Sequence, residues 1–339
     1  MSTTELSPSM IMLEMISANW LSRLIYAAAK LGIADLLKDQ PKSVEELANS
    51  TGTHVHSLYR ALRALASYGV FKEVKPNYFE MTPLAKTLQS GVPGSMLNMA
   101  ITCGEEYYFY PFAKILHTLQ TGEPAFYHFH GMDLFEYLTH HPSEAKCFDE
   151  AMTEYVSQIH SLFANVYDFS GVKKVVDVGG GHGTLLKHIL KANPILTGVL
   201  FDRPSVVEGS RKNIETAGLS DRCEVVGGDF FESVPSGGDV YIISSVIHGR
   251  NDKDSVKILK NCHQAMVENG RILLGEVVIP TGNQPFFGKI QDINLMIAAE
   301  GGGERTEEDF RKLFEMSGLL LTRVIPTQSL GSIVEAIRR

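Results

Sequence analysis

The sequence has few of the residues that mark disulfide-rich, zinc-binding or membrane proteins. Its four cysteines, Cys103, Cys147, Cys223 and Cys262, are scattered and form no Cys-x-x-Cys pair. We therefore expect reduced thiols rather than a disulfide framework or a cysteine-based metal site. The chain has no apolar run of 18 residues, and residues 1–10 lack the basic and apolar regions of a signal peptide. These absences predict a cytoplasmic protein with no membrane partner.

Positive charge is also scarce. The chain has 31 Lys and Arg against 39 Asp and Glu, a formal net charge of −8. This balance argues against nucleic acid as the main partner. The 44% hydrophobic and 21% charged residues are typical of a globular chain, and 339 residues are enough for two domains.

The N-terminal region begins with an unusually apolar segment. Residues 9–29 carry apolar side chains at helical spacing with few charges, and Gly32 is placed to end the helix. A helix this apolar has to be buried. Because it lies far along the chain from the ligand motif described below, we expect it to be buried against a second subunit.

A winged-helix pattern follows this first helix. Ser43 and Glu46 have the spacing of a capping box, and the later elements are a helix at 56–68 and short strands at 71–74 and 78–81. Such a fold can bind DNA, but its second helix carries only two arginines in an acidic chain. The pattern therefore favours a dimerisation or substrate-covering module over DNA binding.

Residues 90–165 read as further helices that are rich in aromatic side chains. Tyr107, Met152 and Phe163 lie in this region, and Met296 lies further along the chain. These four side chains could line a pocket for a flat apolar ligand or simply belong to the core, and the sequence leaves both interpretations open.

From residue 173 onward, short apolar strands alternate with helices. The strands are expected at 173–178, 197–202, 222–226, 239–246, 270–279, 319–325 and 332–336. This alternation predicts a doubly wound, mostly parallel sheet. The last two strands are separated by a short turn and indicate an antiparallel hairpin at the end of the sheet.

A glycine-rich turn follows the first of these strands. Residues 175–183 read Val-Val-Asp-Val-Gly-Gly-Gly-His-Gly and lead into an amphipathic helix. Glycines in such a turn allow a ligand to approach the backbone, and the helix beyond presents free N–H groups. Asp202, at the end of the second strand, is placed to bind ribose hydroxyls.

Other polar residues follow the next strands. Asp229 and Phe230 come after the third strand, where an acid and an aromatic ring suit an adenine, and His248 follows the fourth. Both a nicotinamide dehydrogenase and an S-adenosylmethionine methyltransferase use such an edge. The Gly-Gly-Gly-His-Gly turn departs from the Gly-x-Gly-x-x-Gly pattern of dinucleotide enzymes, so the methyltransferase is favoured. No metal is implied, because His248 has no His or Cys partner at ligand spacing.

These features together resemble the small-molecule O-methyltransferases, typified by plant caffeate and flavonoid enzymes and bacterial antibiotic-tailoring enzymes. The segments that carry the resemblance are the N-terminal helix and winged helix and residues 134–138, 148–152, 177–183, 201–204, 228–231, Glu276 and 302–306. The resemblance implies a Rossmann-like class I methyltransferase α/β sheet, preceded by a mainly helical winged-helix dimerisation domain. It also implies a homodimer in which the N-terminal region helps to close the partner's pocket.

The resemblance further implies three domains and a set of site residues. The domains are a dimerisation domain at 1–95, a helical linker contributing to the substrate pocket at 96–168 and a catalytic domain at 169–339. His248 would be the general base, flanked by Glu276 and Glu304, for an aromatic or polyketide-like acceptor. The residues expected to bind S-adenosylmethionine are Asp177, Gly179, Gly181, Asp202, Arg203, Gly228, Asp229, Phe230, Ser244 and Arg250.

The sequence departs from the family at the proposed base. Family members commonly read His-Asp-Trp where this chain has His248-Gly249-Arg250. Gly249 cannot replace a carboxylate, whereas the Arg250 guanidinium could stack on adenine in place of the tryptophan. O-methyl transfer remains the favoured activity. The alternatives are hydroxylation, decarboxylation or pericyclic chemistry on a methyltransferase fold, or a binding role without catalysis.

Overall fold

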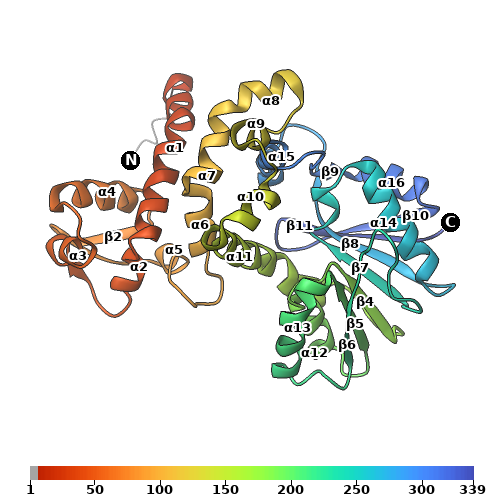
Figure 1. The fold of residues 1–339 in the computed structure, drawn as a ribbon. Helices are drawn as coiled ribbons and strands as arrows, with labels where there is room; N and C mark the ends of the chain where they lie inside the picture. Colours follow the sequence, from red (N-terminus) through yellow and green to blue (C-terminus); the bar gives the residue numbers. More distant parts are fainter. Residues whose placement is uncertain (1–6) are drawn as a thin grey trace. The chain divides into compact units, whose positions relative to one another are not determined.

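The computed structural model describes residues 7–339, apart from the side chains of residues 158–162, 164 and 165. The chain forms two compact units (Figure 1). The first unit comprises Met1–Tyr110 and Leu138–Tyr155, of which Met1–Leu6 lie outside the described residues, and the second comprises Pro111–Tyr137 and Val156–Arg339. In the part of the chain that the structure describes, no helix has both the length and the apolar character needed to span a membrane.

The second unit is built around a mostly parallel sheet. Its strands are β4 (Lys174–Val178), β5 (Thr197–Asp202), β6 (Cys223–Gly227), β7 (Val240–Ser244), β8 (Arg271–Ile279), β10 (Leu319–Pro326) and β11 (Gly331–Arg338), with β9 (Arg305–Thr306) paired to β8. Their order is β10-β11-β8-β7-β4-β5-β6. Strands β4 to β8 are parallel, whereas β11 runs antiparallel to β8 and β10 antiparallel to β11. The predicted sheet with its C-terminal hairpin is therefore confirmed.

Helices cover both faces of this sheet (Figure 1). One face packs against α12 (Thr184–Ala192) and α13 (Pro204–Thr216), and the other packs against α14 (Asp252–Ala265) and α16 (Glu307–Met316). Successive side chains of a strand point to opposite faces. Accordingly, Val175 joins the core beneath α12 and α13, and its neighbour Val176 joins the core beneath α14 and α16.

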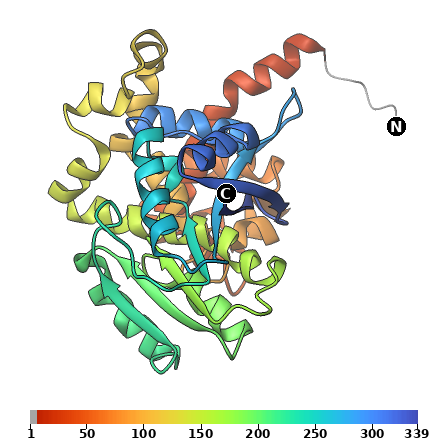
Figure 2. The ribbon, with the colours of Figure 1, turned by 90° about the vertical axis from the view of Figure 1, so that its right-hand side faces the viewer.

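The two edges of the sheet are formed by different parts of the chain. Figure 2, turned by 90° from Figure 1, shows the green early strands and the blue C-terminal hairpin at opposite ends of the sheet. The remaining helices of this unit are α8 (Ile115–Thr121), α9 (Ala125–His130) and α15 (Phe287–Ala298), and α15 contacts both α8 and α9. The 3₁₀ turn η1 (Tyr110–Lys114) and α10 (Leu134–His140) connect segments of the two units.

The first unit contains the expected helices and hairpin. Its elements are α1 (Pro8–Lys30), α2 (Ile33–Leu36), β1 (Lys42–Ser43), α3 (Val44–Thr51), α4 (Val55–Ser67), β2 (Phe71–Lys75), β3 (Tyr78–Met81), α5 (Pro83–Lys86), α6 (Leu97–Gly104), α7 (Glu106–Phe109) and the start of α11 (Pro142–Val166). The strand order is β1-β3-β2. The predicted capping box is present: the Ser43 hydroxyl accepts from the Glu46 N–H at 3.2 Å, and the Glu46 carboxylate accepts from the Ser43 N–H at 2.7 Å.

Helix α1 ends where the sequence predicts, but most of it lies uncovered in the single chain. Gly32 follows its C-terminal cap with φ +64°, a left-handed conformation that glycine adopts without strain. Ala28 and Ala29 are buried, whereas Met15, Ile16 and Trp20 are 66%, 64% and 66% exposed. The apolar surface predicted to meet a second subunit is therefore available at this helix.

Candidate active site

The carboxyl edge of the parallel strands gathers the residues that the sequence singled out. The glycine-rich turn leaves β4, Asp202 ends β5, and Asp229 follows β6. His248 lies in the 3₁₀ turn η2 (Ile247–Gly249) directly after β7, and Glu276 lies within β8. Parallel strands end at one edge, so five separate segments contribute to one site in the second unit.

The glycine-rich turn is shaped for close approach of a ligand. Gly179 and Gly181 have φ values of +74° and +54°, which side chains other than glycine rarely adopt. A Cβ on Gly179 would lie 2.8 Å from Val246 Cγ2, so no side chain fits there. Above Gly181, by contrast, no heavy atom lies within 4 Å of the Cβ position. This combination of a tight turn and open space fits the adenosyl cofactor that the resemblance implies.

Asp202 is held beside this turn by two backbone groups. Its Oδ2 accepts a hydrogen bond from the Gly181 N–H at 2.8 Å, and its Oδ1 accepts from the Arg203 N–H at 2.7 Å. Each carboxylate oxygen has more than one lone pair, so both can also accept from ribose hydroxyls. Arg203 is exposed and contributes this N–H as the N-cap of α13.

Asp177 lies beneath the turn rather than beside its open face. It is 2% exposed, and its Oδ2 would touch a Cβ on Gly180 at 2.6 Å. Burial, together with the negative charge of Asp202, raises the pKa of Asp177 to about 7, despite a hydrogen bond from the Leu186 backbone. Asp177 therefore joins the turn to α12, and it is protonated over much of the acidic range.

An aromatic patch lies next to the glycine turn. The Phe230 ring comes within 3.8 Å of the position of a Cβ on Gly179, and it meets Phe231 edge to face. A Cβ on Gly228 would lie 2.5 Å from the Phe201 ring, which explains the glycine there. The Asp229 carboxylate is exposed and accepts from the Phe231 N–H at 2.8 Å.

Arg250 belongs to the same patch. Its guanidinium lies 5.7 Å from the centroid of the Phe231 ring, a distance at which cations and rings still attract. The sequence raised the idea that Arg250 stacks on adenine. In the structure, the aromatic ring next to the Arg250 guanidinium is that of Phe231.

His248 is held through one ring nitrogen by two buried carboxylates. Its Nδ1 lies 3.2 Å from Glu304 Oε1 and 3.8 Å from Glu276 Oε2. The His248 side chain is 18% exposed, and each glutamate side chain is 1% exposed. A carboxylate only accepts hydrogen bonds, so Nδ1 carries the proton and Nε2 retains a lone pair. That tautomer is the one a general base needs.

The two carboxylates also change the pKa of the imidazole. Burial by itself lowers the pKa of His248, but the charge of Glu276 and the hydrogen bond and charge of Glu304 outweigh this and raise it above 6.5. Burial raises the pKa of Glu276, with Glu304 adding to the effect and His248 opposing it. An imidazolium at this position is therefore stabilised by its surroundings.

The turn that carries His248 is anchored at both its N–H groups and its carbonyls. Glu276 Oε1 accepts from the Val246 and Ile247 N–H groups at 3.1 and 2.9 Å. Arg305 Nη1 donates to the Ile247 carbonyl at 2.9 Å, and its Nη2 donates to the Arg250 carbonyl and to Asp252 Oδ1, both at 2.8 Å. The sequence identified Glu276 as a site residue but missed Arg305.

Glu304 is positioned by a contact that the sequence also did not reveal. The Glu304 N–H donates to Asp292 Oδ1 at 2.8 Å, which links the residue to α15. The Gly303 N–H donates to the His248 carbonyl at 2.8 Å. The segment before β9 is therefore tied both to α15 and to the turn of the proposed base.

The end of β7 has an unusual backbone. A strand was expected over 239–246, but β7 ends at Ser244 because Ser245 adopts φ +55°. Within residues 7–339, Asn77 is the only other non-glycine residue with a positive φ. Such a conformation costs about 1–2 kcal/mol and is common at functional sites. Ser244 itself is buried and donates to the Gly275 carbonyl at 3.2 Å.

The four proposed pocket residues have different surroundings. Phe163 is 1% exposed and packs in the core beneath α12 and α13, with its Cε2 3.1 Å from a Cβ built on Gly275. Met296 is half-buried on α15. Tyr107 is buried and Met152 half-buried within the first unit, and burial raises the pKa of the Tyr107 hydroxyl.

Comparison with known proteins identifies the family. Residues 112–320 match the O-methyltransferase domain, and residues 13–91 match the O-methyltransferase dimerisation domain. Phenazine O-methyltransferase PhzM of Lysobacter antibioticus is 47% identical over 328 residues, which cover 97% of this chain and 96% of that protein.

Two solved structures extend the comparison. The crystal structure of LaPhzM has a TM-score of 0.91 at 46% identity and covers 98% of this chain and 100% of that one. The SAH-bound structure of CalO1, a methyltransferase in calicheamicin biosynthesis, has a TM-score of 0.89 at 32% identity and covers 100% of both chains. None of these relatives supports a dehydrogenase or a non-methylating activity. The chain belongs to the O-methyltransferase family, and it is an S-adenosylmethionine-dependent enzyme.

Proposed function

We propose that this enzyme methylates a hydroxyl group of a small, flat aromatic specialised metabolite, with His248 as the general base. The observation that carries this proposal is the position of both carboxylates at His248 Nδ1, at 3.2 and 3.8 Å, which leaves Nε2 to remove the proton of the acceptor. The bound cofactor supplies an electrophilic methyl group on its sulfonium sulfur. General-base catalysis of this kind contributes about 10²–10⁴-fold to a rate.

The cofactor site is proposed at the glycine turn. Gly179 and Gly181 would admit the ligand, and Asp202 would bind its ribose hydroxyls. The other proposed contacts are Arg203, Gly228, Asp229, Phe230, Ser244 and Arg250. Asp177 would act from below by supporting the turn, since its side chain is buried.

The acceptor class is proposed from the relatives and from the residues expected to line the pocket. The similar Lysobacter antibioticus protein is named for a phenazine, a fused aromatic ring system. Met296, half-buried on α15 in the same unit as His248, would offer an apolar wall for such a ring. We assign Tyr107 and Met152 to the helical linker at 96–168, between a dimerisation domain at 1–95 and a catalytic domain at 169–339.

The assembly is proposed to be a cytoplasmic homodimer. The match to a dimerisation domain and the exposed apolar residues of α1 both support this state. We assign the winged-helix pattern of the first unit to dimerisation rather than to DNA binding, in keeping with the net charge of −8.

The first test is calorimetric titration with S-adenosylmethionine, S-adenosylhomocysteine and NAD. Both adenosyl ligands should bind the wild-type protein, and their affinity should fall at least tenfold in Asp202→Ala, whereas NAD should not bind. Hydroxylated fused-ring aromatics such as hydroxyphenazines should then gain 14 mass units, as measured by mass spectrometry, and His248→Ala should lower the rate at least 100-fold. Adenosyl binding without methylation of any hydroxylated aromatic would contradict the proposed acceptor class, and an active His248→Ala would contradict the assignment of the base.

A further inference from the structure

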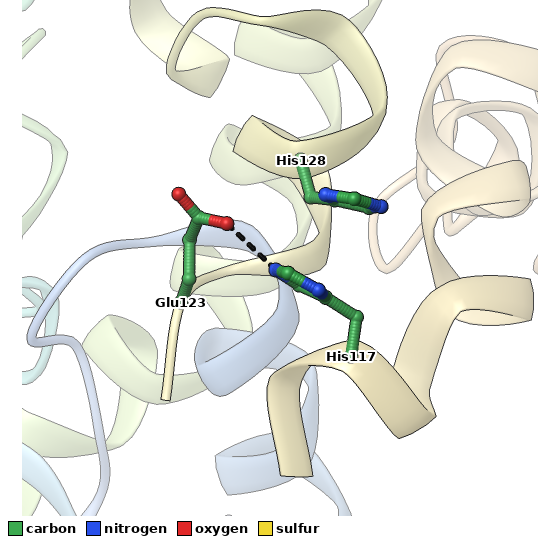
Figure 3. Close-up of side chains that lie close together, drawn as sticks. All are labelled: His117, Glu123 and His128. Atoms are coloured by element: carbon green, nitrogen blue, oxygen red, sulfur yellow. Dashed lines mark hydrogen bonds and ion pairs between the residues drawn. The ribbon is translucent and has the colours of Figure 1, made fainter. Parts of the chain in front are cut away.

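A second group of histidine and carboxylate side chains lies outside the active site. His117 lies on α8, Glu123 lies in the short connection after it, and His128 lies on α9 (Figure 3). All three belong to Pro111–Tyr137, within the second unit. None of them has a part in the proposed methyl transfer.

The three side chains lie close together. His117 Nε2 and Glu123 Oε2 are 2.6 Å apart, and one donor atom from each of the three residues lies within 4.8 Å of the others. The rings of His117 and His128 stack with centroids 3.7 Å apart at an angle of 16°. Figure 3 shows the Glu123 carboxylate beside this stack, directed at the lower ring.

We propose that His117, Glu123 and His128 bind a divalent first-row transition metal ion of the zinc type. Two imidazoles and one carboxylate are a common protein ligand set for such ions, with water completing the coordination. The site is accessible, because the side chains of His117 and Glu123 are 24% and 43% exposed and His128 is exposed. The proposal is independent of the methyl-transfer reaction.

The required rearrangement is small. Zinc bonds of about 2.0–2.1 Å place tetrahedral ligands roughly 3.3 Å apart, so the His117–Glu123 pair would widen as the ion replaces the shared proton. Imidazole nitrogens bind in the plane of the ring, so one ring of the stack has to turn. His128 is exposed and can turn about its Cβ–Cγ bond without displacing core side chains.

The ion would act on the structure rather than on the reaction. It would join α8 to α9 across residues 122–124, and both helices contact α15. Helix α15 carries Asp292, whose carboxylate accepts from the Glu304 N–H. Metal binding would therefore stabilise the helices that support one neighbour of the proposed base.

The test is isothermal titration of the tag-free, chelator-treated protein with zinc chloride, followed by differential scanning calorimetry. We expect each chain to bind one zinc ion through this cluster. We also expect zinc to raise the melting temperature. His117→Gln and His128→Gln should each weaken binding at least tenfold and abolish the thermal shift.

Two further variants make the result specific. His140→Gln, an exposed histidine on α10, should leave zinc binding unchanged. A second histidine and carboxylate cluster is formed by His248, Glu276 and Glu304, and His248→Gln tests whether zinc binds there instead. This variant should leave the ion at His117 and His128 in place. The proposal is overturned if the wild-type protein binds no zinc, or if all zinc binding survives in His128→Gln.

Discussion

His248 has both of its carboxylate neighbours on the same ring nitrogen, and this one-sided arrangement determines its chemistry. Glu304 accepts from Nδ1, and Glu276 adds a second negative charge at 3.8 Å. Together they fix the tautomer and favour the charged imidazolium. The same carboxylates raise the pKa of His248, so the proposed base is neutral and able to accept a proton only at higher pH.

Replacing Glu304 with glutamine should move the acidic limb of the pH profile of kcat/KM to lower pH. The amide keeps the size of the side chain but removes a charge that raises the pKa of His248, so the imidazole loses its proton at lower pH. The maximal rate should fall, since the imidazolium is less well stabilised. Glu308→Gln, an exposed carboxylate on α16, is the matched control and should leave the profile unchanged. An acidic limb that stays in place in Glu304→Gln would show that this carboxylate does not act on the base.

Asp177→Asn should change how stability depends on pH. The folded protein keeps the Asp177 proton up to a pKa of about 7, whereas the unfolded chain releases it at about 3.9. The wild-type free energy of unfolding therefore falls between about pH 4 and pH 7, by up to roughly 4 kcal/mol. The asparagine variant lacks this titration, so it should gain stability relative to wild type as the pH rises through this window. Urea unfolding of the cofactor-free wild type and variant at pH 5 and pH 8 measures the effect. If the free energies of unfolding of the two proteins differed by the same amount at both pH values, the prediction would be contradicted.

At the scale of elements, the turn after β7 is held in place from two directions. Glu276 in β8 accepts from its N–H groups, and Arg305 in β9 donates to its carbonyls. The pairing of β9 with β8 places these two anchors on adjacent strands. Because Ser245 has a positive φ, the turn depends on such contacts to keep its shape.

Arg305→Gln should lower kcat at least tenfold and change the KM for S-adenosylmethionine much less. Arg305 bonds to the backbone of the turn that carries His248, and losing it frees the carbonyls of Ile247 and Arg250 and lets His248 move. A displacement of about 1 Å can cost 10²-fold in rate. Arg305→Lys should rescue the rate only in part, because a lysine cannot donate to several separate acceptors in a fork.

The control for this variant is Arg311→Gln, which removes an exposed ion pair with Glu307 on α16. Steady-state kinetics and a melting curve should be recorded for each variant. If Arg305→Gln were folded and kept the wild-type kcat, Arg305 would be shown not to position His248.

Local patterns were sufficient to predict the sheet and to place part of the candidate site at the strand ends. Strand β4, the glycine turn and Asp202 follow from apolar runs and glycine spacing, which are properties of neighbouring residues. Arg305 has no such signal, because its contacts with the Ile247 and Arg250 carbonyls join residues 58 and 55 positions apart. The positive φ of Ser245 and the convergence of His117 with His128 likewise arise only from the fold.

At the scale of the whole molecule, the N-terminal helix is the surface at which we expect a second subunit to bind. Helix α1 carries four apolar side chains that are more than half exposed in the single chain, namely Met12, Met15, Ile16 and Trp20. Contiguous apolar surface of this kind marks an interaction site. The dimerisation domain matched by residues 13–91 contains most of this helix, so a second copy of the chain is the expected partner.

Ile16→Glu should therefore convert the proposed dimer into a monomer at low micromolar concentration. A charge buried at an apolar interface without a partner costs several kcal/mol, which outweighs the contacts that remain. Sedimentation velocity measures the mass, and Trp20, the chain's single tryptophan, provides a second signal. Its fluorescence should shift to longer wavelength in Ile16→Glu and on dilution of the wild-type protein, because dissociation exposes the indole to water. Gln264→Glu, which adds the same single negative charge to the exposed surface of α14, should change neither mass nor emission. A dimer that persists in Ile16→Glu with unchanged emission would place the subunit interface away from this face of α1.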